Sequence, residues 1–397
     1  MANIDENGFE PGDRLAEMDL AAHNAEQAEA WAAFNAGKPV RTPIVFGTNT
    51  RYFMRAPRAN PEGLDFRRYT EDPDVMFHAL LGYARWSRFN LLQDQQLGLP
   101  DRWSVSPDFQ NYYEAAWFGC PVEYRDGQVP DATPAYADAP ERLLDRGLPD
   151  PSGGLMARAE AYCERFRELA KQGPFLGREI EVGLPGPCFG TDGPMTVACN
   201  LFGPGFVCAA MAAEPNRLHR LLEFITDATI LRMETWRRRY ETPFPQDGFG
   251  CADDSIALIS TAMYREHILP YHRRIYDTFG TPQGRSIHLC GNSTRHFRTI
   301  HEELGVVAFD TGFPVDFGRL RRELGPDIKL LGGPHVGLLQ SSTPAEVYVE
   351  TRRIMQSGVL EGGLFVLREG NNLAPETPLD NTEAMYRAGR EFGKFAA

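Results

Sequence analysis

Short apolar runs alternate with amphipathic segments from residue 248 to the end of the chain. Each run is followed by a helical pattern, and the runs read GFGCADD, RSIHLCG, VVAFDTG, IKLLGGPH and GLFVLREG. Strand and helix patterns that alternate at this spacing are typical of a parallel sheet covered by helices. We therefore expect an α/β protein in which about eight such units close into a (β/α)8 TIM barrel.

The first part of the chain is less regular. Residues 1–40 read as a polar tail that leads into a helix, which predicts an N-terminal helical extension. The first strand candidate is TPIVFGT at 42–48, and a long amphipathic helix is expected over 215–241. Residues from about 95 to 155 are rich in aromatic residues and proline, which predicts an insertion with a short hairpin. Residues 41–397 are expected to form one barrel domain that carries this insertion.

Two helix starts carry a local signature. Thr343 and Glu346 have the spacing of a capping box, and Pro344 would occupy the first helical position. Asp380 and Glu383 repeat this spacing before the last helical pattern. Both pairs are predicted to cap the helices that follow them.

The composition and the net charge argue against several classes of protein. The chain has 397 residues, 42% of them hydrophobic, and a formal net charge of −13. This charge argues against a nucleic-acid or anionic membrane surface, because both require basic patches. No run approaches the roughly 18 apolar residues of a membrane helix, and the acidic N-terminus has no signal-peptide pattern. Seven irregularly spaced cysteines predict reduced thiols, and hence a cytoplasmic protein.

Polar and ionisable residues follow several of the predicted strands. In a TIM barrel the active site lies at the carboxyl ends of the strands. The predicted strands here end in chemically active groups in succession. These groups are Asp253, Asp254, His288, Cys290, Asp310, His335, Glu369 and Asn371.

His288 and Cys290 are separated by one residue at the end of a strand pattern. Side chains at i and i+2 of a strand point the same way, so both would face the barrel mouth. An imidazole nitrogen and a thiolate sulfur form half of a zinc site. The alternative is a core cysteine beside a histidine that bonds a backbone carbonyl. His335 and Glu369 are the further candidate ligands, although His335 also fits an ordinary loop histidine.

Three aspartates are candidate catalytic residues. Asp253 and Asp254 are adjacent, so only one of them is expected to face the mouth, where it could act as a general acid. The alternative role for one of the two is to cap the following helix. Asp310 would orient a ligand histidine or cap a turn.

Residues after the first strand candidate are expected to line the substrate pocket. Asn49, Arg51 and Tyr52 are the candidates, and Asn371 could hydrogen-bond a substrate. A surface salt bridge is the alternative for Arg51. Phosphate loops, the dinucleotide fingerprint and the G-x-S-x-G elbow are absent from the sequence.

Several longer segments occur in the order of one known family. They include TPIVFGTNTRYF, GTDGPMTVACNLFGP, ADDSIALISTAMYREHILPYHRRIYD, SIHLCGN, FDTGFPVDFGRLRRELG and GLFVLREGNNLAPETPLDN. Together they cover most of residues 40–393. On these segments the chain resembles the uroporphyrinogen decarboxylase superfamily, and in particular its methyltransferase branch, which transfers methyl groups to or from corrinoid proteins.

The chain departs from the motifs of this superfamily at two places. Of the decarboxylases' arginine-rich first loop only Arg51-Tyr52 is present, so porphyrinogen decarboxylation is not expected. The methyltransferase branch binds zinc with His-x-Cys and a later cysteine in a Pro-Gly-Cys context. His288 and Cys290 match the first part, but Asn371 stands where the later cysteine would be. A thiol-activating enzyme is therefore not the first expectation.

The resemblance implies methyl transfer from a small methylated substrate to cobalamin or another corrinoid, with a metal's assistance. A methoxylated aromatic donor would fit the aromatic residues around Tyr112, Tyr113 and Trp117. The sequence has no Asp-x-His-x-x-Gly motif, so a corrinoid protein would be a separate partner. The alternatives are a decarboxylase (lyase) of a small acid, with Arg51 on the carboxylate, and a non-catalytic relative that binds a tetrapyrrole or cobalamin. The assembly state stays open, with a homodimer as one candidate.

Overall fold

Five parallel strands in the order β5-β6-β7-β8-β9 form the longest continuous sheet of the computed structural model, which describes residues 4–57 and 59–395. The strands are β5 (Gly250–Ala252), β6 (Ser286–Leu289), β7 (Ala308–Thr311), β8 (Lys329–Gly332) and β9 (Phe365–Leu367). They are the five strands that the apolar runs predict.

Three further strand segments supply the other strand positions of the barrel. Ile44 pairs in parallel with Leu367, and the amide of Val45 donates to the carbonyl of Leu367 at 3.0 Å. Strand β1 (Trp103–Val105) pairs in parallel with β4 (Ile180–Val182). The segment at Ile44, β1, β4 and β5 to β9 supply the eight strand positions of a (β/α)8 barrel, and the predicted fold is confirmed.

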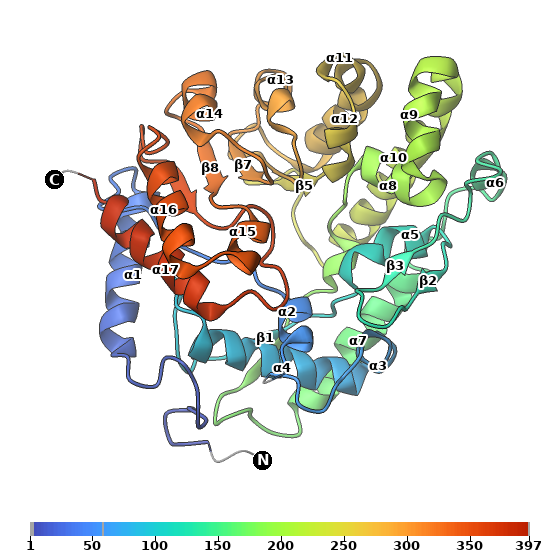
Figure 1. Cartoon of the computed structure of the whole chain (residues 1–397). Helices are drawn as coiled ribbons and strands as arrows, with labels where there is room; N and C mark the ends of the chain where they lie inside the picture. The colour runs from blue at the N-terminus through green and yellow to red at the C-terminus, as the bar shows by residue number, and fades with distance from the viewer. Residues whose placement is uncertain (1–3, 58, 396–397) are drawn as a thin grey trace.

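Helices surround the strands in chain order, from α1 in blue to α17 in red (Figure 1). The first group comprises α1 (Leu20–Asn35), α2 (Thr50–Arg55), α3 (Phe66–Glu71), α4 (Pro73–Asn90), α5 (Tyr113–Trp117), α6 (Arg142–Asp145), α7 (Gly154–Ala170), α8 (Pro194–Phe202) and α9 (Pro204–Ala213). The second comprises α10 (Pro215–Arg239), α11 (Thr261–Met263), α12 (Leu269–Phe279), α13 (Phe297–Leu304), α14 (Phe317–Leu324), α15 (Val336–Ser341), α16 (Pro344–Met355) and α17 (Leu379–Phe392).

Alternation along the strands decides which side chains enter the barrel. In β6, Ile287 and Leu289 are 1% and 0% exposed and belong to the hydrophobic core. Ser286 and His288 occupy the other face of the same strand, because side chains alternate with a period of two. The small residues Gly250, Ser286 and Ala308 leave a cavity of about 510 Å³ inside the barrel, which His288, Asp310 and Lys329 also line.

The N-terminal helix packs against the end of the chain. The indole of Trp31 on α1 donates to the carbonyl of Asp94 at 2.7 Å, and Glu26 pairs with Arg390 of α17. Helices α1 and α17 therefore lie side by side (Figure 1).

The segment 95–155 differs in part from the expected insertion. It contains the predicted hairpin, formed by β2 (Val122–Glu123) and β3 (Asp131–Ala132). It also contains the barrel strand β1, whose Trp103 and Val105 are buried. The inserted part therefore begins after Val105.

The two predicted capping boxes have different outcomes. Thr343 and Glu346 form the reciprocal box at the start of α16, as predicted. The second prediction is wrong, because α17 begins at Leu379 and has no side-chain cap. Asp380 and Glu383 instead form ion pairs with Arg14.

Within residues 4–57 and 59–395, no single helix is long and apolar enough to cross a membrane. Helices α8 and α9 reach the required length and composition only when taken together, and they meet at a bend of 110°. All seven cysteines are free thiols.

Candidate functional site

Asp254, His288 and Cys290 converge at the carboxyl ends of β5 and β6. Their potential ligand atoms all lie within 4.8 Å of one another. His288 Nε2 is 3.1 Å from Cys290 Sγ and 4.0 Å from Asp254 Oδ1, and Asp254 Oδ1 accepts the amide of Cys290 at 2.7 Å. Nitrogen, sulfur and carboxylate oxygen in one group can hold a divalent transition metal.

A second layer of residues fixes His288. Asp310 is its register partner on β7, and Asp310 Oδ2 lies 2.7 Å from His288 Nδ1. Arg368 donates to the same oxygen at 2.8 Å. Because Asp310 is best satisfied by a proton on Nδ1, the lone pair of Nε2 is directed toward Cys290 and Asp254. The contact between Asp310 and His288 fits one of the two roles predicted for Asp310.

The charges around the group are mainly negative. Burial opposes a charge on His288, but the hydrogen bond to Asp310 and the charges of Asp310 and Asp254 outweigh it and raise its pKa. Burial raises the pKa of the Cys290 thiol, and Asp254 and Asp310 raise it further. A bound cation would offset both effects, since it favours a thiolate and a neutral imidazole.

Asn371 approaches the same cysteine. Its Oδ1 is 3.0 Å from Cys290 Sγ, and its backbone has a φ of 83°, in the left-handed region that asparagine tolerates better than most residues. Gly312 fixes the other side of the loop: a Cβ on Gly312 would lie 2.3 Å from the amide nitrogen of Gly291. The loop of Cys290 is therefore held in place by close backbone packing.

Two candidate metal ligands lie outside this group. His335 is exposed, caps α15 by accepting from the amide of Leu338 at 3.2 Å, and stacks on Phe313. Glu369 is fully buried, and its Oε1 accepts from the amide of Gly47 at 2.8 Å. His335 thus acts as a helix cap, whereas Glu369 Oε2 is buried without a hydrogen-bond partner among the described residues. A metal-ligand role for either residue stays a prediction.

The acidic pair divides as strand alternation requires. Asp253 is fully buried and accepts hydrogen bonds from the amides of Met195 and Thr196, the hydroxyl of Thr196 and the ring of His272. It therefore caps α8, whereas the predicted cap was on the helix that follows the aspartate pair. Only Asp254 belongs to the candidate metal group. With four donors on its carboxylate, Asp253 has no free oxygen lone pair directed at a substrate.

The predicted pocket residues after the first strand segment lie on α2. Asn49 caps this helix by accepting from the amide of Arg51 at 3.0 Å. Tyr52 is 4% exposed, and its hydroxyl donates to the carbonyl of Thr377 at 2.6 Å. Arg51 donates to the side-chain oxygens of Gln110 and Asn111. Of the three, Arg51 is the one whose charge acts on Cys290.

Sequence reasoning missed two residues near this site. Arg368 follows β9 directly and holds Asp310, and it was visible in VLREGN as a charge beside the candidate ligands. Asp192 lies in the quoted segment GTDGPM and interacts electrostatically with Asp254. Neither has a local pattern that separates it from an ordinary surface charge.

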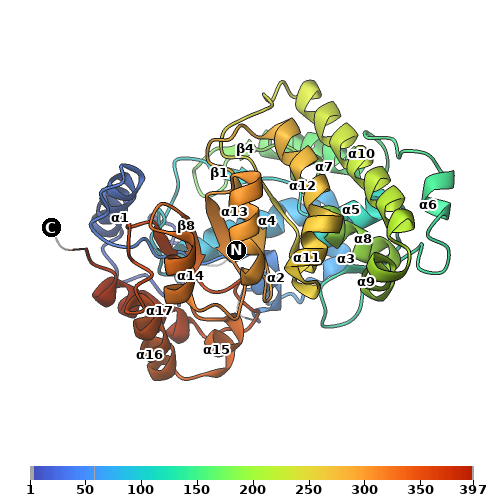
Figure 2. The same cartoon turned by 90° about the horizontal axis from the view of Figure 1, so that it is seen from above.

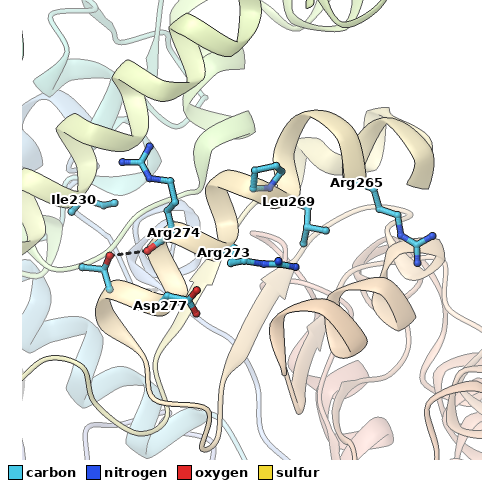
Figure 3. A pocket seen from close by; sticks show the side chains of 8 residues that line it. Ile230, Arg265, Leu269, Arg273, Arg274 and Asp277 are labelled. Atoms are coloured by element: carbon cyan, nitrogen blue, oxygen red, sulfur yellow. Dashed lines mark hydrogen bonds between the residues drawn. The ribbon is translucent and has the colours of Figure 1, made fainter.

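A larger cavity lies elsewhere, on the outside of the barrel. It measures about 800 Å³ and is lined by residues of α10 and α12. Figure 2 shows these two helices on the outside of the barrel. Figure 3 shows Arg265, Arg273 and Arg274 around it, and Arg274 is paired with Glu223 at 2.8 Å and Asp227 at 2.6 Å. None of the predicted site residues lines it, so the candidate site remains the barrel mouth.

The buried Glu369 gives a test of pH dependence. Burial raises its pKa to about 7 from the ordinary 4.5, against the opposing effect of Arg368. The folded state therefore binds this proton more tightly, and its contribution to stability is present below pH 4.5 and lost as pH rises through about 7. Relative to Glu369→Gln, the wild type should lose on the order of 3 kcal/mol of unfolding free energy across this range.

Urea denaturation of both proteins from pH 4.5 to 8 measures this difference. The exposed Glu361→Gln variant is the control, and it should follow the wild type at every pH. Parallel stability curves for wild type and Glu369→Gln would show that folding does not raise the pKa of Glu369.

The fold and the site together define a barrel protein with a candidate metal centre at the carboxyl ends of its strands. The chain belongs to the uroporphyrinogen decarboxylase (URO-D) family, whose profile matches residues 26–392.

Two curated relatives are enzymes of different activity. The chain is 26% identical over 299 residues to a methylated-thiol–coenzyme M methyltransferase of Methanosarcina mazei, covering 72% of each protein. It is 29% identical over 232 residues to the uroporphyrinogen decarboxylase of Saccharopolyspora erythraea, covering 53% of this chain and 60% of that one. The solved structure of a methyltransferase from Methanosarcina mazei superposes with a TM-score of 0.62 at 18% identity, over 92% of this chain and 98% of the other. The solved structure shows a shared fold. The methyltransferase relative supports an enzyme of the methyltransferase branch, as predicted.

Proposed function

We propose that this protein transfers a methyl group from a small methylated donor to a reduced corrinoid, with a zinc ion held by Asp254, His288 and Cys290. The observation that carries this proposal is the convergence of their nitrogen, sulfur and oxygen atoms within 4.8 Å. The similarity to a methylated-thiol–coenzyme M methyltransferase supports the same reaction class.

The donor set fits zinc. Three protein ligands and one open position are typical of catalytic zinc sites. Zinc, when bound, would supply positive charge beside the heteroatom that carries the methyl group. The chain's own contribution is orientation: Asp310 fixes the ring of His288 at 2.7 Å, and Arg368 holds Asp310 at 2.8 Å.

Arg51 supports a donor with an anionic group. Among the residues that the structure describes, no carboxylate forms an ion pair with it, and its donors go to the amide oxygens of Gln110 and Asn111. The amide nitrogen of Gln110 donates to Asp108, which turns the amide oxygen toward Arg51. An oriented guanidinium bonded only to neutral acceptors in the protein suits a substrate carboxylate. A methoxybenzoate combines this carboxylate with a methyl ether.

The same arginine favours a second candidate function, decarboxylation of a small acid. The curated uroporphyrinogen decarboxylase relative is in line with this alternative. Release of CO2 from the donor, measured in the same reaction, separates the two functions.

The test is an anaerobic assay with cob(I)alamin, 3-methoxybenzoate and the purified protein, in which methylcobalamin is followed by absorbance. We expect about one zinc per chain, methyl transfer by the zinc-loaded protein, loss of transfer after chelation and recovery when zinc is restored. Equal rates in the metal-free protein would overturn the metal's role. If methoxybenzoates, methanol, methylamines and methyl thioethers all failed as donors, the proposed function would be wrong.

A further inference from the structure

A clamped loop between β4 and α8 carries Asp192. The amide of Asp192 donates to Glu114 Oε2 at 2.7 Å, and the hydroxyl of Thr191 donates to the same oxygen at 3.1 Å. The other oxygen of Glu114 pairs with Arg232, which also donates to the carbonyl of Gly190 at 2.7 Å. Glu114 and Arg232 are 1% and 0% exposed. The buried ion pair of Glu114 and Arg232 therefore fixes the backbone at Asp192.

The loop is also fixed against the end of β5. The carbonyl of Thr191 accepts from the amide of Ala252 at 3.4 Å. Gly193 has a φ of 88°, and a Cβ there would lie 2.5 Å from the Cβ of Asp253. These contacts hold Asp192 beside the residues that lead from β5 into Asp254, at the same end of the barrel as the candidate metal group.

The side chain of Asp192 differs from its acidic neighbours in its lack of partners among the described residues. Within residues 4–57 and 59–395 its carboxyl has no hydrogen bond or ion pair with the protein, whereas Glu114 and Asp253 each accept several hydrogen bonds. Asp192 keeps some solvent exposure, so its carboxyl is free to meet a ligand.

The surrounding charges favour a neutral carboxyl. Burial raises the pKa of Asp192 well above its ordinary value, and the charges of Glu114, Asp254 and Asp253 raise it further against Arg232. Arg232 forms no ion pair with Asp192 in the part of the chain that the structure describes, and its Nη1 and Nη2 donate instead to Glu114, Gly190 and Pro187. The titratable groups that interact electrostatically with Asp192 are Tyr113 and Glu114 from α5, Arg232 from α10, Arg51 from α2, and Asp253 and Asp254 after β5.

We propose that Asp192 is the catalytic proton donor to the leaving group of the methyl transfer, a role that rests on the proposed function. The reduced corrinoid supplies an electron pair to the methyl carbon, and the carbon–oxygen bond breaks with its electron pair on oxygen. That oxygen takes the proton of the Asp192 carboxyl and leaves as a phenol. The Asp192 carboxylate then regains a proton from water.

The test compares Asp192→Asn with wild type on 3-methoxybenzoate and on ring-nitrated 3-methoxybenzoates, whose phenols are progressively more acidic. A general acid contributes about 10²- to 10⁴-fold, and this contribution should shrink as the leaving phenolate needs less protonation. We expect a loss of at least about 100-fold on 3-methoxybenzoate and a clearly smaller loss on each more acidic phenol. Glu181→Gln, an exposed carboxyl on β4, is the matched control.

Infrared spectroscopy gives a readout that needs no substrate. Wild type at pH 7 should show a protonated-carboxyl band that is missing in Asp192→Asn. An equal loss on all donors, or no such band, would overturn the role of Asp192 while the proposed function stands. If the wild type transfers no methyl group from any donor, the proposed function fails first, and the role of Asp192 fails with it.

Discussion

Replacing His288 and Cys290 together with alanine is expected to abolish stoichiometric zinc binding and to slow corrinoid methylation by about 10³-fold. The basis is the several kcal/mol of charge stabilisation that a catalytic metal supplies, of which about 4 kcal/mol corresponds to three decades in rate. The double variant removes two of three converging ligand atoms and leaves Asp254 alone. Metal content by mass spectrometry and methylcobalamin formation measure both effects on one preparation.

The matched control is Cys251→Ala. Cys251 is a buried thiol on β5 whose sulfur lies 3.5 Å from the hydroxyl of Tyr276, outside the candidate metal group. It should keep its zinc and its activity. A double variant that bound zinc as well as the wild type would place the metal elsewhere and would invalidate the site.

Breaking the buried pair of Arg232 and Glu114 is expected to have the largest effect on stability. Arg232→Met leaves the Glu114 carboxylate buried without its cation, which costs about 3–5 kcal/mol of unfolding free energy. Burial already raises the pKa of Glu114, and loss of Arg232 raises it further. The destabilisation should therefore shrink as pH falls and Glu114 takes up a proton.

Urea denaturation at pH 7.5 measures this cost. Arg319→Met breaks an exposed pair in which the side chains of Arg319 and Glu323 are 70% and 38% exposed, and it should leave the unfolding free energy nearly unchanged. The double variant Arg232→Met/Glu114→Gln should recover part of the loss, because no buried charge is left. Equal losses for Arg232→Met and Arg319→Met would show that the buried pair contributes no more than a surface pair.

The fold was predictable where local sequence determines structure. Strands β5 to β9 are apolar runs between helical patterns, and each one was identified. Strand β1 was missed because its three residues lie in an aromatic and proline-rich stretch and pair only with β4, far along the chain. The capping box at Thr343 is local and was found, whereas Asp380 and Glu383 are claimed by Arg14, more than 360 residues away.

The candidate site was likewise predictable only where local sequence determines it. His288 and Cys290 come from strand alternation, and the same rule predicts that only one of Asp253 and Asp254 faces the mouth. The rule cannot say which one, since that depends on α8, whose amides bind Asp253. Asp192 depends on Glu114, 78 residues away, and Glu114 depends on Arg232, 118 residues away. Such contacts leave no periodic trace in the sequence.

The cavity inside the barrel has a consequence for the access of water to the candidate site. Its cavity of about 510 Å³ extends from the level of Lys329, where β8 begins, to His288 and Asp310. Polar groups at both levels allow it to hold water. A bulky corrinoid protein seated on the mouth would thus close only one side of the site. Water could still reach His288 through the interior, so solvent exchange there need not wait for the partner to dissociate.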